Sequence, residues 1–488
     1  MATRTFDVCI LGAGPAGYAA AMRAHDLGKR VALVEKGRVG GSGIHAGALS
    51  SKTMWHLSND YARTRRTDRG YRASDVTVSY EAVIEAVSTA VEERRASLVR
   101  QLDQLSTPDA AGGSVTLIKG TARFASRNAV EVTTDGVVER IEASHFLVAT
   151  GSIPRIPPGM DVDGDRILTS DHVEALSDFP ESMVIVGAGV IGCEYATIFA
   201  NYQKTKISII DRQPRILPFE DEDVADVVAA SFEQLGVRIH RESKLESLRV
   251  VGGKVEYVVC DSKGLMCEPI RVERALVSVG RGPNTGSLGL RELGVELDAS
   301  GGLVVNDTQS VSVPTLWAAG DVTMDIALAN VAELEGRHAV ERMFGLAPAP
   351  IRYEALSAIM FLSPEVASVG LNEQQAKKKG IDYCIGSVGN ALINRNIAMR
   401  ETRGFLKLLA TREAPHRVLG LRVVGPEASS CIQGIAFLID QGASVEDIDR
   451  CVHPHPAITE GVQECARLIL GRSIHKPQVF GGSLLRRS

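Results

Sequence analysis

One pattern occurs twice in this chain and limits the folds that it can adopt. In its first copy, an apolar strand at residues 6–11 is followed by a glycine-rich turn, an alanine-rich helix and a second strand that ends in Glu35. Glycines allow a tight turn and let a pyrophosphate approach the backbone N–H groups at the helix start. Glu35 lies 23 residues after Gly12, where a carboxylate can accept hydrogen bonds from a ribose. This segment therefore predicts a dinucleotide-binding unit.

The second copy has the same order of parts. A strand at residues 183–186 precedes the turn at residues 187–192, and the strand at residues 206–210 ends in Asp211, 24 residues after Gly187. Two such units are more specific than either alone. They predict two bound dinucleotides and an α/β fold with two Rossmann-like, doubly wound domains.

Size and charge narrow the class of protein further. With 488 residues, the chain is too long for one core and suggests three domains. A net charge of -5 gives no reason to expect a nucleic acid partner. We find no secretory signal and no run of about 18 apolar residues, so we expect a cytoplasmic protein without a membrane span.

Several other segments predict individual elements. Residues 80–105 have the 3.6-residue apolar period of an amphipathic helix, and residues 114–148 alternate like short strands with a turn at residues 135–136. Prolines at positions 154, 157 and 158 indicate a crossing into another domain. From about residue 348 the pattern changes to antiparallel strands and helices. We expect the tail at residues 473–488 to be a solvated end or to lie on a partner.

The chain has eight cysteines, and none forms a Cys-x-x-Cys pair. We expect each of them to behave as a small buried apolar residue. Cys260 and Cys267 could also face each other across a hairpin, and the sequence leaves that open. No cluster of metal ligands is predicted, because His453 and His455 lack further ligands nearby.

Residues 39–52, which follow the first unit, read Val-Gly-Gly-Ser-Gly-Ile-His-Ala-Gly-Ala-Leu-Ser-Ser-Lys. With the two dinucleotide units, this segment resembles the redox segment of the pyridine nucleotide-disulfide oxidoreductases, Gly-Gly-x-Cys-x4-Cys-x3-Lys. In that family, two thiols pass electrons between flavin and substrate. The glycines and the lysine of the pattern are Gly40, Gly41 and Lys52. The cysteine positions hold Gly43 and Ala48, which cannot form a disulfide. The resemblance therefore implies the family's frame without its dithiol.

The resemblance extends from residue 5 to about residue 470. It implies an FAD-binding domain at residues 1–152 and 279–347, an NAD(P)-binding domain at residues 153–278, and an α+β dimerisation domain with a tail at residues 348–488. It also implies a homodimer in which the partner's C-terminal domain completes each flavin site.

The matching motifs imply the cofactor contacts. For FAD they are Gly12, Gly14, Pro15, Ala16, Gly17, Glu35, Lys36, Gly40, Gly41, Ser42, Lys52, Ala149, Thr150, Gly151, Arg281, Gly320, Asp321, Ala327, Leu328 and Ala329. For NAD(P) they are Gly187, Gly189, Val190, Ile191, Glu194, Asp211, Arg212 and Gly280. Asp211 would repel a 2′-phosphate and favours NAD(H), whereas Arg212 and Arg215 could grip a phosphate and leave NADP(H) as the alternative.

Five residues are candidates for chemistry. By resemblance, Lys52 and Glu194 form an ion pair beside the flavin, and His455 acts as an acid or base that Glu460 orients. His45 adds a polar group to the altered segment, as in relatives that resemble the soluble pyridine nucleotide transhydrogenases.

The leading hypothesis is an FAD-dependent enzyme that moves a hydride from NAD(P)H to flavin and on to a small non-disulfide acceptor, as a soluble transhydrogenase does. One alternative is an NAD(P)H:quinone reductase that uses the thiol-free flavin face. Others are a dihydrolipoyl dehydrogenase-like protein with a degenerate redox site, and a flavin-bearing regulatory protein without turnover. Exchange with a disulfide requires an attacking sulfur, which the segment lacks.

Overall fold

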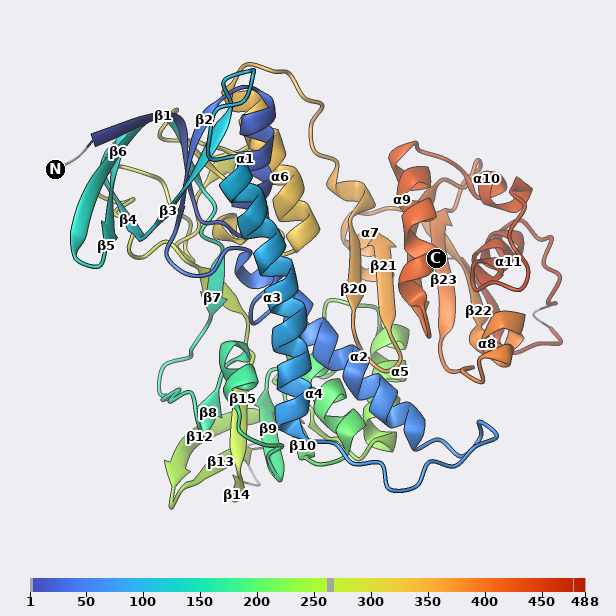
Figure 1. Ribbon diagram of the computed structural model, residues 1–488. Helices are drawn as coiled ribbons and strands as arrows, with labels where there is room; N and C mark the ends of the chain where they lie inside the picture. The colour runs from blue at the N-terminus through green and yellow to red at the C-terminus, as the bar shows by residue number, and fades with distance from the viewer. Residues whose placement is uncertain (1–2, 261–266, 477, 488) are drawn as a thin grey trace.

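A computed structural model describes residues 3–260, 267–476 and 478–487, and it divides them into three regions, each built on its own main sheet (Figure 1). The elements of the N-terminal region are β1 (Thr3–Leu11), α1 (Pro15–Asp26), β2 (Arg30–Glu35), α2 (Ala48–Thr64), α3 (Tyr80–Gln104), β3 (Ser114–Lys119), β4 (Thr121–Ser126), β5 (Ala129–Thr134), β6 (Val137–Val148), β17 (Val305–Asn306), β18 (Gln309–Ser310), β19 (Leu316–Ala318) and α6 (Ala329–Met343).

The sheet of this region has the strand order β17-β18-β19-β6-β1-β2-β3, and β4 and β5 extend it beside β6. Strands β3, β2, β1, β6 and β19 are parallel. Residues 8–11 of β1 are all buried, which is typical of a strand covered on both faces of a parallel sheet. Helices α1 and α6 pack against each other. The first glycine-rich turn follows β1 directly, so it lies at the carboxyl end of the parallel strands.

The predicted helix at residues 80–105 is α3. Val83, Val87, Val91, Leu98 and Leu102 are buried on one face at helical spacing. The Ser79 hydroxyl caps the helix by accepting a hydrogen bond from the amide of residue 82 at 3.3 Å. At the same end, the Tyr80 hydroxyl donates to the Val173 carbonyl at 2.6 Å. Helix α3 therefore connects the first region to the second (Figure 1).

The second region holds the second glycine-rich unit. Its elements are β8 (Ile167–Leu168), β9 (Ser182–Val186), α4 (Val190–Tyr202), β10 (Lys206–Ile210), α5 (Glu222–Gln234), β11 (Arg238–His240), β12 (Lys244–Val251), β13 (Lys254–Cys260), β14 (Glu268–Val272) and β15 (Arg274–Val277). Strands β11-β10-β9-β15-β8 form a parallel sheet, and β12-β13-β14 form a separate antiparallel one. The chain enters through β7 (Ser152–Pro154) and leaves through β16 (Arg281–Pro283), which pair antiparallel.

The third region is antiparallel, with the strand order β20-β21-β24-β23-β22-β25. Its elements are β20 (Ser357–Met360), β21 (Val366–Gly370), α7 (Glu373–Lys378), β22 (Tyr383–Gly389), α8 (Asn394–Ala398), β23 (Phe405–Thr411), β24 (Val418–Val424), α9 (Ile432–Asp440), α10 (Val445–Arg450), α11 (Thr459–Ile469) and β25 (Ser483–Arg487). The predicted class, two Rossmann-like units and an α+β C-terminal domain, is confirmed by the sheets. The exact domain boundaries stay a prediction.

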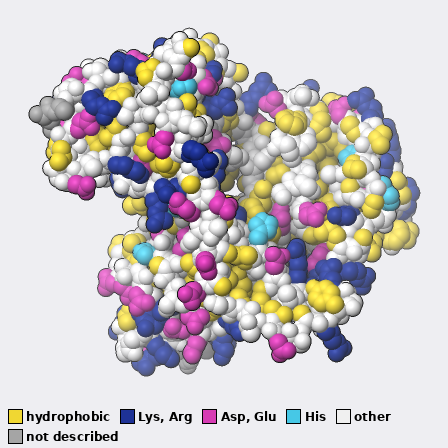
Figure 2. Space-filling view, viewed as in Figure 1, with side chains coloured by type: hydrophobic (Ala, Val, Ile, Leu, Met, Phe, Trp, Pro, Cys, Tyr) yellow, Lys and Arg dark blue, Asp and Glu magenta, His cyan; other side chains and the backbone are white. Residues whose placement is uncertain are grey.

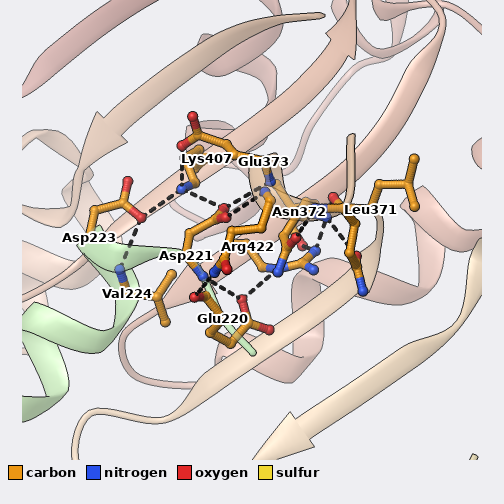
Figure 3. A network of polar contacts seen from close by, with 12 residues as sticks. Glu220, Asp221, Asp223, Val224, Leu371, Asn372, Glu373, Lys407 and Arg422 are labelled. Atoms are coloured by element: carbon orange, nitrogen blue, oxygen red, sulfur yellow. Dashed lines mark hydrogen bonds and ion pairs between the residues drawn. The ribbon is translucent and has the colours of Figure 1, made fainter. Parts of the chain in front are cut away.

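A buried polar network joins the second region to the third (Figure 3). Lys407 on β23 is 2% exposed, and its ammonium lies 2.8 Å from Asp221, 2.6 Å from Asp223 and 3.0 Å from Glu373. The ammonium therefore neutralises three carboxylates whose spacing resembles a cation site. Beside it, the Arg422 guanidinium donates to Glu220 at 2.9 Å and to backbone carbonyls of residues 369–371.

Two expectations for the chain are corrected. Residues 483–487 of the tail are not a free end, because they form β25, which pairs with β22 at the edge of the third sheet, and Leu484 on it stays exposed. Cys260 and Cys267 are not separate buried thiols but a disulfide that joins β13 to the start of β14. Cys451 is exposed, whereas Cys9 and four other free cysteines are buried as expected.

The surface visible in Figure 2 has no large patch of a single charge. On the face shown in Figure 2, acidic and basic side chains are interspersed with apolar ones, and the surface is hollowed between the N-terminal and C-terminal regions. Within the described part of the chain, no helix is both long and apolar enough to cross a bilayer.

Candidate functional site

A cavity of about 960 Å³ is lined by residues from all three regions. Most of the predicted cofactor residues line it. They are Gly12, Gly14, Pro15, Ala16, Glu35, Lys36, Gly41, Ser42, Lys52, Ala149, Thr150, Gly151, Arg281, Gly320, Asp321, Ala327, Leu328, Ala329, Gly189, Val190, Ile191, Glu194 and Gly280. Five predicted cofactor residues do not line it, namely Gly17, Gly40, Gly187, Asp211 and Arg212.

The two glycine-rich turns have the same backbone shape. Gly12 and Gly187 have φ of 106° and 104°, a region that side chains disfavour. A Cβ at Gly17 would collide with the carbonyl of Gly12, so this glycine serves the close packing of the helix on the turn. A Cβ at Gly189 would meet no atom within 4 Å. The backbone is therefore closely packed within the turn, whereas space is free beside the glycine at the helix start, where a pyrophosphate binds.

The two acidic residues at the strand ends also correspond. Glu35 accepts hydrogen bonds from the amides of Ala13 at 2.7 Å and Gly37 at 2.6 Å. Asp211 accepts from the amides of Ala188 at 2.6 Å and Gln213 at 2.8 Å. Each carboxylate is thus fixed beside its glycine-rich turn, and each oxygen can still accept a further hydrogen bond.

Lys52 and Glu194 meet at the cavity although they lie in different regions. Lys52 comes from α2 and Glu194 from α4, and their Nζ and Oε2 atoms are 2.7 Å apart. Glu194 is only 7% exposed in its side chain, against 25% for Lys52. The other carboxylate oxygen of Glu194 accepts from the amide of Phe361 at 3.0 Å, and the Lys52 ammonium lies 5.1 Å from the Phe361 ring centre. The ion pair is therefore held from both sides.

The altered redox segment is tightly packed. Gly43 lies in a short 3-10 turn, and a Cβ added to it would be 2.7 Å from the ring of Pro15. Ala48 starts α2 and lines the cavity. Among the described residues, no cysteine lines this cavity. Cys193 is next to Glu194 in sequence, but it is buried, and burial raises the pKa of its thiol far above the ordinary value.

A second cavity, of about 720 Å³, adjoins the first across Gly14, Pro15, Gly43 and Ala329, which line both. Its other walls come from α1, α3, α6 and the altered segment. The walls combine apolar side chains with three charged ones and the hydroxyl groups of Tyr18 and Ser97. The lining residues that it does not share with the first cavity are Tyr18, Ala19, Gly40, Ile44, Leu49, Ala90, Glu93, Arg94, Ser97, Leu98 and Glu333.

His45 lines neither cavity. Its Nε2 atom is 3.0 Å from the carbonyl oxygen of Val39, and its buried Nδ1 atom has no hydrogen-bond partner within the described chain. Burial lowers the pKa of His45 and outweighs the hydrogen bond with the Val39 carbonyl, which raises it. A direct role for His45 at the flavin is therefore not supported by its position within one chain.

His455 and Glu460 form a pair in the third region, away from both cavities of the same chain. His455 Nδ1 is 2.7 Å from Glu460 Oε1, and the amide of Ala457 donates to Oε2 at 2.9 Å. Burial raises the pKa of Glu460, but these hydrogen bonds outweigh it, so the pKa lies below its usual range. The His455 side chain is 63% exposed and can face another molecule.

The structure adds site residues that the sequence patterns did not indicate. Ser152 follows the Ala-Thr-Gly run and contacts Asp321. Phe361 and Ile359 reach the cavity from the third region, as does Gln433 on α9. The position of Ser152 after a predicted strand end offered a signal, whereas the others depend on contacts between distant parts of the chain.

The chain was compared with known proteins. The sequence profile of the pyridine nucleotide-disulphide oxidoreductases matches residues 6–336, and that of their dimerisation domain matches residues 356–466. Dihydrolipoyl dehydrogenase 3 of Haloarcula marismortui is 35% identical over 97% of this chain and 98% of its own. Dihydrolipoyl dehydrogenase of Bacillus subtilis is 33% identical over 96% and 97%.

A solved structure shows the same relationship. The crystal structure of LpdA from Mycobacterium tuberculosis has a TM-score of 0.85 and 27% identity, covering 96% of this chain and 99% of that one. RclA from Escherichia coli, described as a HOCl-induced flavoprotein disulfide reductase, has a TM-score of 0.82 at 24% identity and shares the fold. This chain belongs to the pyridine nucleotide-disulfide oxidoreductases, a flavoprotein oxidoreductase family whose members bind FAD and use NAD(H).

Proposed function

We propose that this protein is an FAD-dependent NAD(P)H oxidoreductase that delivers electrons to a small acceptor other than a disulfide. The observation that carries this proposal is the absence of sulfur from the lining of the described cavity, with Gly43 and Ala48 at the two thiol positions. Its relatives include proteins named dihydrolipoyl dehydrogenase, so the acceptor is where this chain departs from them.

The residues at both proposed nucleotide sites are of the types that bind a dinucleotide. The glycine-rich turns leave room at the starts of α1 and α4, and Glu35 and Asp211 stand ready for ribose hydroxyls. When bound, FAD supplies the two-electron chemistry by taking a hydride from reduced nicotinamide and passing it on. The residues of the chain bind and orient the two nucleotides. Lys52 places a positive charge at the cavity, and Glu194 holds its ammonium in place.

NAD(H) is the favoured nicotinamide nucleotide. Asp211 at the end of β10 carries the charge that repels a 2′-phosphate. The Arg215 guanidinium donates to the carbonyls of Pro218 at 3.4 Å and Glu220 at 3.1 Å, so it is directed away from a phosphate-binding role. Arg212 is exposed and is the remaining candidate for binding NADP(H).

For the acceptor, we propose a second nicotinamide, which gives transhydrogenase activity. Without a thiol relay, the acceptor has to approach the flavin directly. The first cavity offers such a route, and most of the predicted NAD(P)-binding residues line it. The second cavity favours the alternative, a quinone, because its walls combine apolar and polar side chains and it adjoins the first cavity at Gly43, one of the two thiol positions of the family pattern. In a dimer, the exposed His455 of one protomer could supply a proton at the other protomer's flavin.

Anaerobic mixing tests the proposal. NADH should bleach the flavin absorbance rapidly, and NADPH should do so more slowly. The reduced enzyme is then mixed with an NAD analogue, a benzoquinone or lipoamide. Fast reoxidation by either of the first two supports the proposal, and loss of quinone turnover in His455→Gln selects the quinone.

Lipoamide turnover that thiol alkylation abolishes would overturn the proposal. Cys451→Ser is the matched background for that assay, because Cys451 is the exposed free cysteine of the described chain. Absence of bleaching with either nucleotide would instead favour a flavin-bearing protein without turnover.

A further inference from the structure

The two crossings between the nucleotide-binding regions meet at one ribbon. In this ribbon, β7 and β16 pair so that Arg281 lies opposite Pro154 and Pro283 lies opposite Ser152. The two strands are the covalent connections between the regions, which also pack on each other through α2 and α4. Ser152 and Arg281 also line the large cavity, so the ribbon borders the site.

The hydroxyl of Ser152 bridges two charged groups at this place. It donates a hydrogen bond to Asp321 Oδ2 at 2.6 Å and accepts one from Arg281 Nε at 2.7 Å. Arg281 Nη2 also donates to the Ser152 carbonyl at 2.8 Å, which fixes the guanidinium along the strand. A serine hydroxyl has one proton to donate and two lone pairs, so it can serve the carboxylate and the guanidinium at once.

The contacts continue on both sides of Ser152. Arg281 Nη1 lies 3.9 Å from Asp171 Oδ1 in the second region. Asp321 follows Gly320, whose amide donates to the buried carboxylate of Glu335 on α6 at 2.7 Å. Asp321 lines the cavity, and Ser152 holds its Oδ2 atom, whereas within the described chain its Oδ1 atom makes no side-chain hydrogen bond.

We propose that Ser152 is a positioning residue that fixes Asp321 for FAD and couples the FAD site to the NAD(P) region through Arg281. The proposal rests on the FAD and NAD(P) sites of the proposed function but not on the identity of the acceptor. Loss of the hydroxyl frees the Asp321 carboxylate to rotate and leaves Arg281 without its side-chain acceptor. FAD then binds to a site that must first be ordered.

FAD binding to the apoprotein tests the first part. Ser152→Ala should weaken FAD binding by roughly 10- to 100-fold, because a hydrogen bond to a charged group is lost. Ser152→Thr, which keeps the hydroxyl on a strand that tolerates β-branching, should bind FAD within about threefold of the wild type. Thr285→Val is the matched control, because the Thr285 hydroxyl donates to Gly301 at 2.9 Å beside the ribbon but does not line the cavity.

Coupling is read from FAD affinity measured with and without saturating NAD⁺. In the wild type NAD⁺ should tighten FAD binding, and in Ser152→Ala the ratio of the two affinities should fall towards one. Ser152→Cys under reducing conditions, with a weaker donor of similar size, provides the same comparison if the alanine variant does not fold. FAD affinity of Ser152→Ala within twofold of the wild type would overturn the positioning role. A wild-type affinity that NAD⁺ does not change would overturn the coupling.

These measurements need no electron acceptor. A failed acceptor screen with the expected change in FAD affinity would count against the proposed function alone. An unchanged FAD affinity with successful turnover would count against the role of Ser152 alone.

Discussion

Replacement of Lys407 by methionine tests whether the polar network between the second and third regions is as tightly closed as its distances indicate. Methionine keeps most of the length of the side chain and removes the charge. The change would leave Asp221 and Glu373, both buried or nearly so, and the half-buried Asp223 without their shared ammonium (Figure 3). Removal of one partner from a buried ion pair leaves an uncompensated charge, which generally costs about 3–5 kcal/mol.

The lower end of that range applies here. Arg486 on β25 lies 2.8 Å from Glu373 and 3.6 Å from Asp223, so it retains part of the compensation. A loss of about 3 kcal/mol lowers the melting temperature by about 3 °C if all 488 residues unfold together, since the unfolding entropy is about 2 cal/mol/K per residue. If the third region unfolds first by itself, the same loss lowers its transition by about 10 °C.

Calorimetry of the wild type, Lys407→Met and the control Lys378→Met at two pH values checks this reasoning. Lys378 is exposed on the neighbouring α7, so its replacement should change the free energy of unfolding by less than about 0.5 kcal/mol. In Lys407→Met, mutual repulsion of the three carboxylates raises their pKa values in the folded state. The folded variant therefore takes up protons as the pH falls from about 7 to 5.5, and its loss of stability relative to the wild type should become smaller. A melting temperature within 1 °C of the wild type at neutral pH would refute the argument.

Three other outcomes are expected. Burial lowers the pKa of His45, His145 and His240 below about 6.5, so the unfolded chain binds more protons than the folded one. The free energy of unfolding, measured by calorimetry, should therefore fall as the pH drops from about 7.5 to 5.5, and His145→Phe should make this fall less steep. A rise in stability over the same pH range would contradict the prediction. Gly43→Ala should cost about 1–3 kcal/mol in thermal unfolding and reduce bound FAD, because the added methyl meets a proline ring; full FAD content at wild-type stability would be the contrary result. Asp211→Asn should raise kcat/KM for NADPH relative to NADH at least roughly fivefold, and an unchanged ratio in steady-state assays would exclude this residue as the discriminator.

Much of the fold is encoded in local patterns, which is why it could be predicted from the sequence. The glycines of both turns, the apolar strands before them and the acidic residues after them act within about 25 residues of one another, and Gly12 and Gly187 show why the turn needs glycine. The long helix α3 follows from one apolar face. The pairing of Lys52 with Glu194 came from the family resemblance and not from any pattern, since 142 residues separate the two.

The remaining features depend on contacts that no local pattern encodes. The tail strand β25 is short and follows two glycines, and it is a strand because β22 offers an open edge. Ser152 meets Asp321 across 169 residues, and its functional interest lies in that contact and not in its neighbours in sequence. His45 is a polar residue in the right segment, yet the turn of the backbone directs its ring to the Val39 carbonyl.

One side of the candidate flavin site matches the family pattern and the other does not, and this difference bears on the proposed acceptor. On the side of the second glycine-rich unit, the cavity has an ion pair in which the Glu194 carboxylate accepts hydrogen bonds from Lys52 and from the amide of Phe361. On the side of the altered segment, a Cβ at position 43 would lie 2.7 Å from the ring of Pro15, so a cysteine there would need that ring or the segment to shift. A thiol at position 43 therefore does not fit the segment as it is packed, although Gly43 lines both cavities. Under the proposed function, the acceptor therefore reaches the flavin directly through one of the two cavities, because no cysteine is among the described residues that line them.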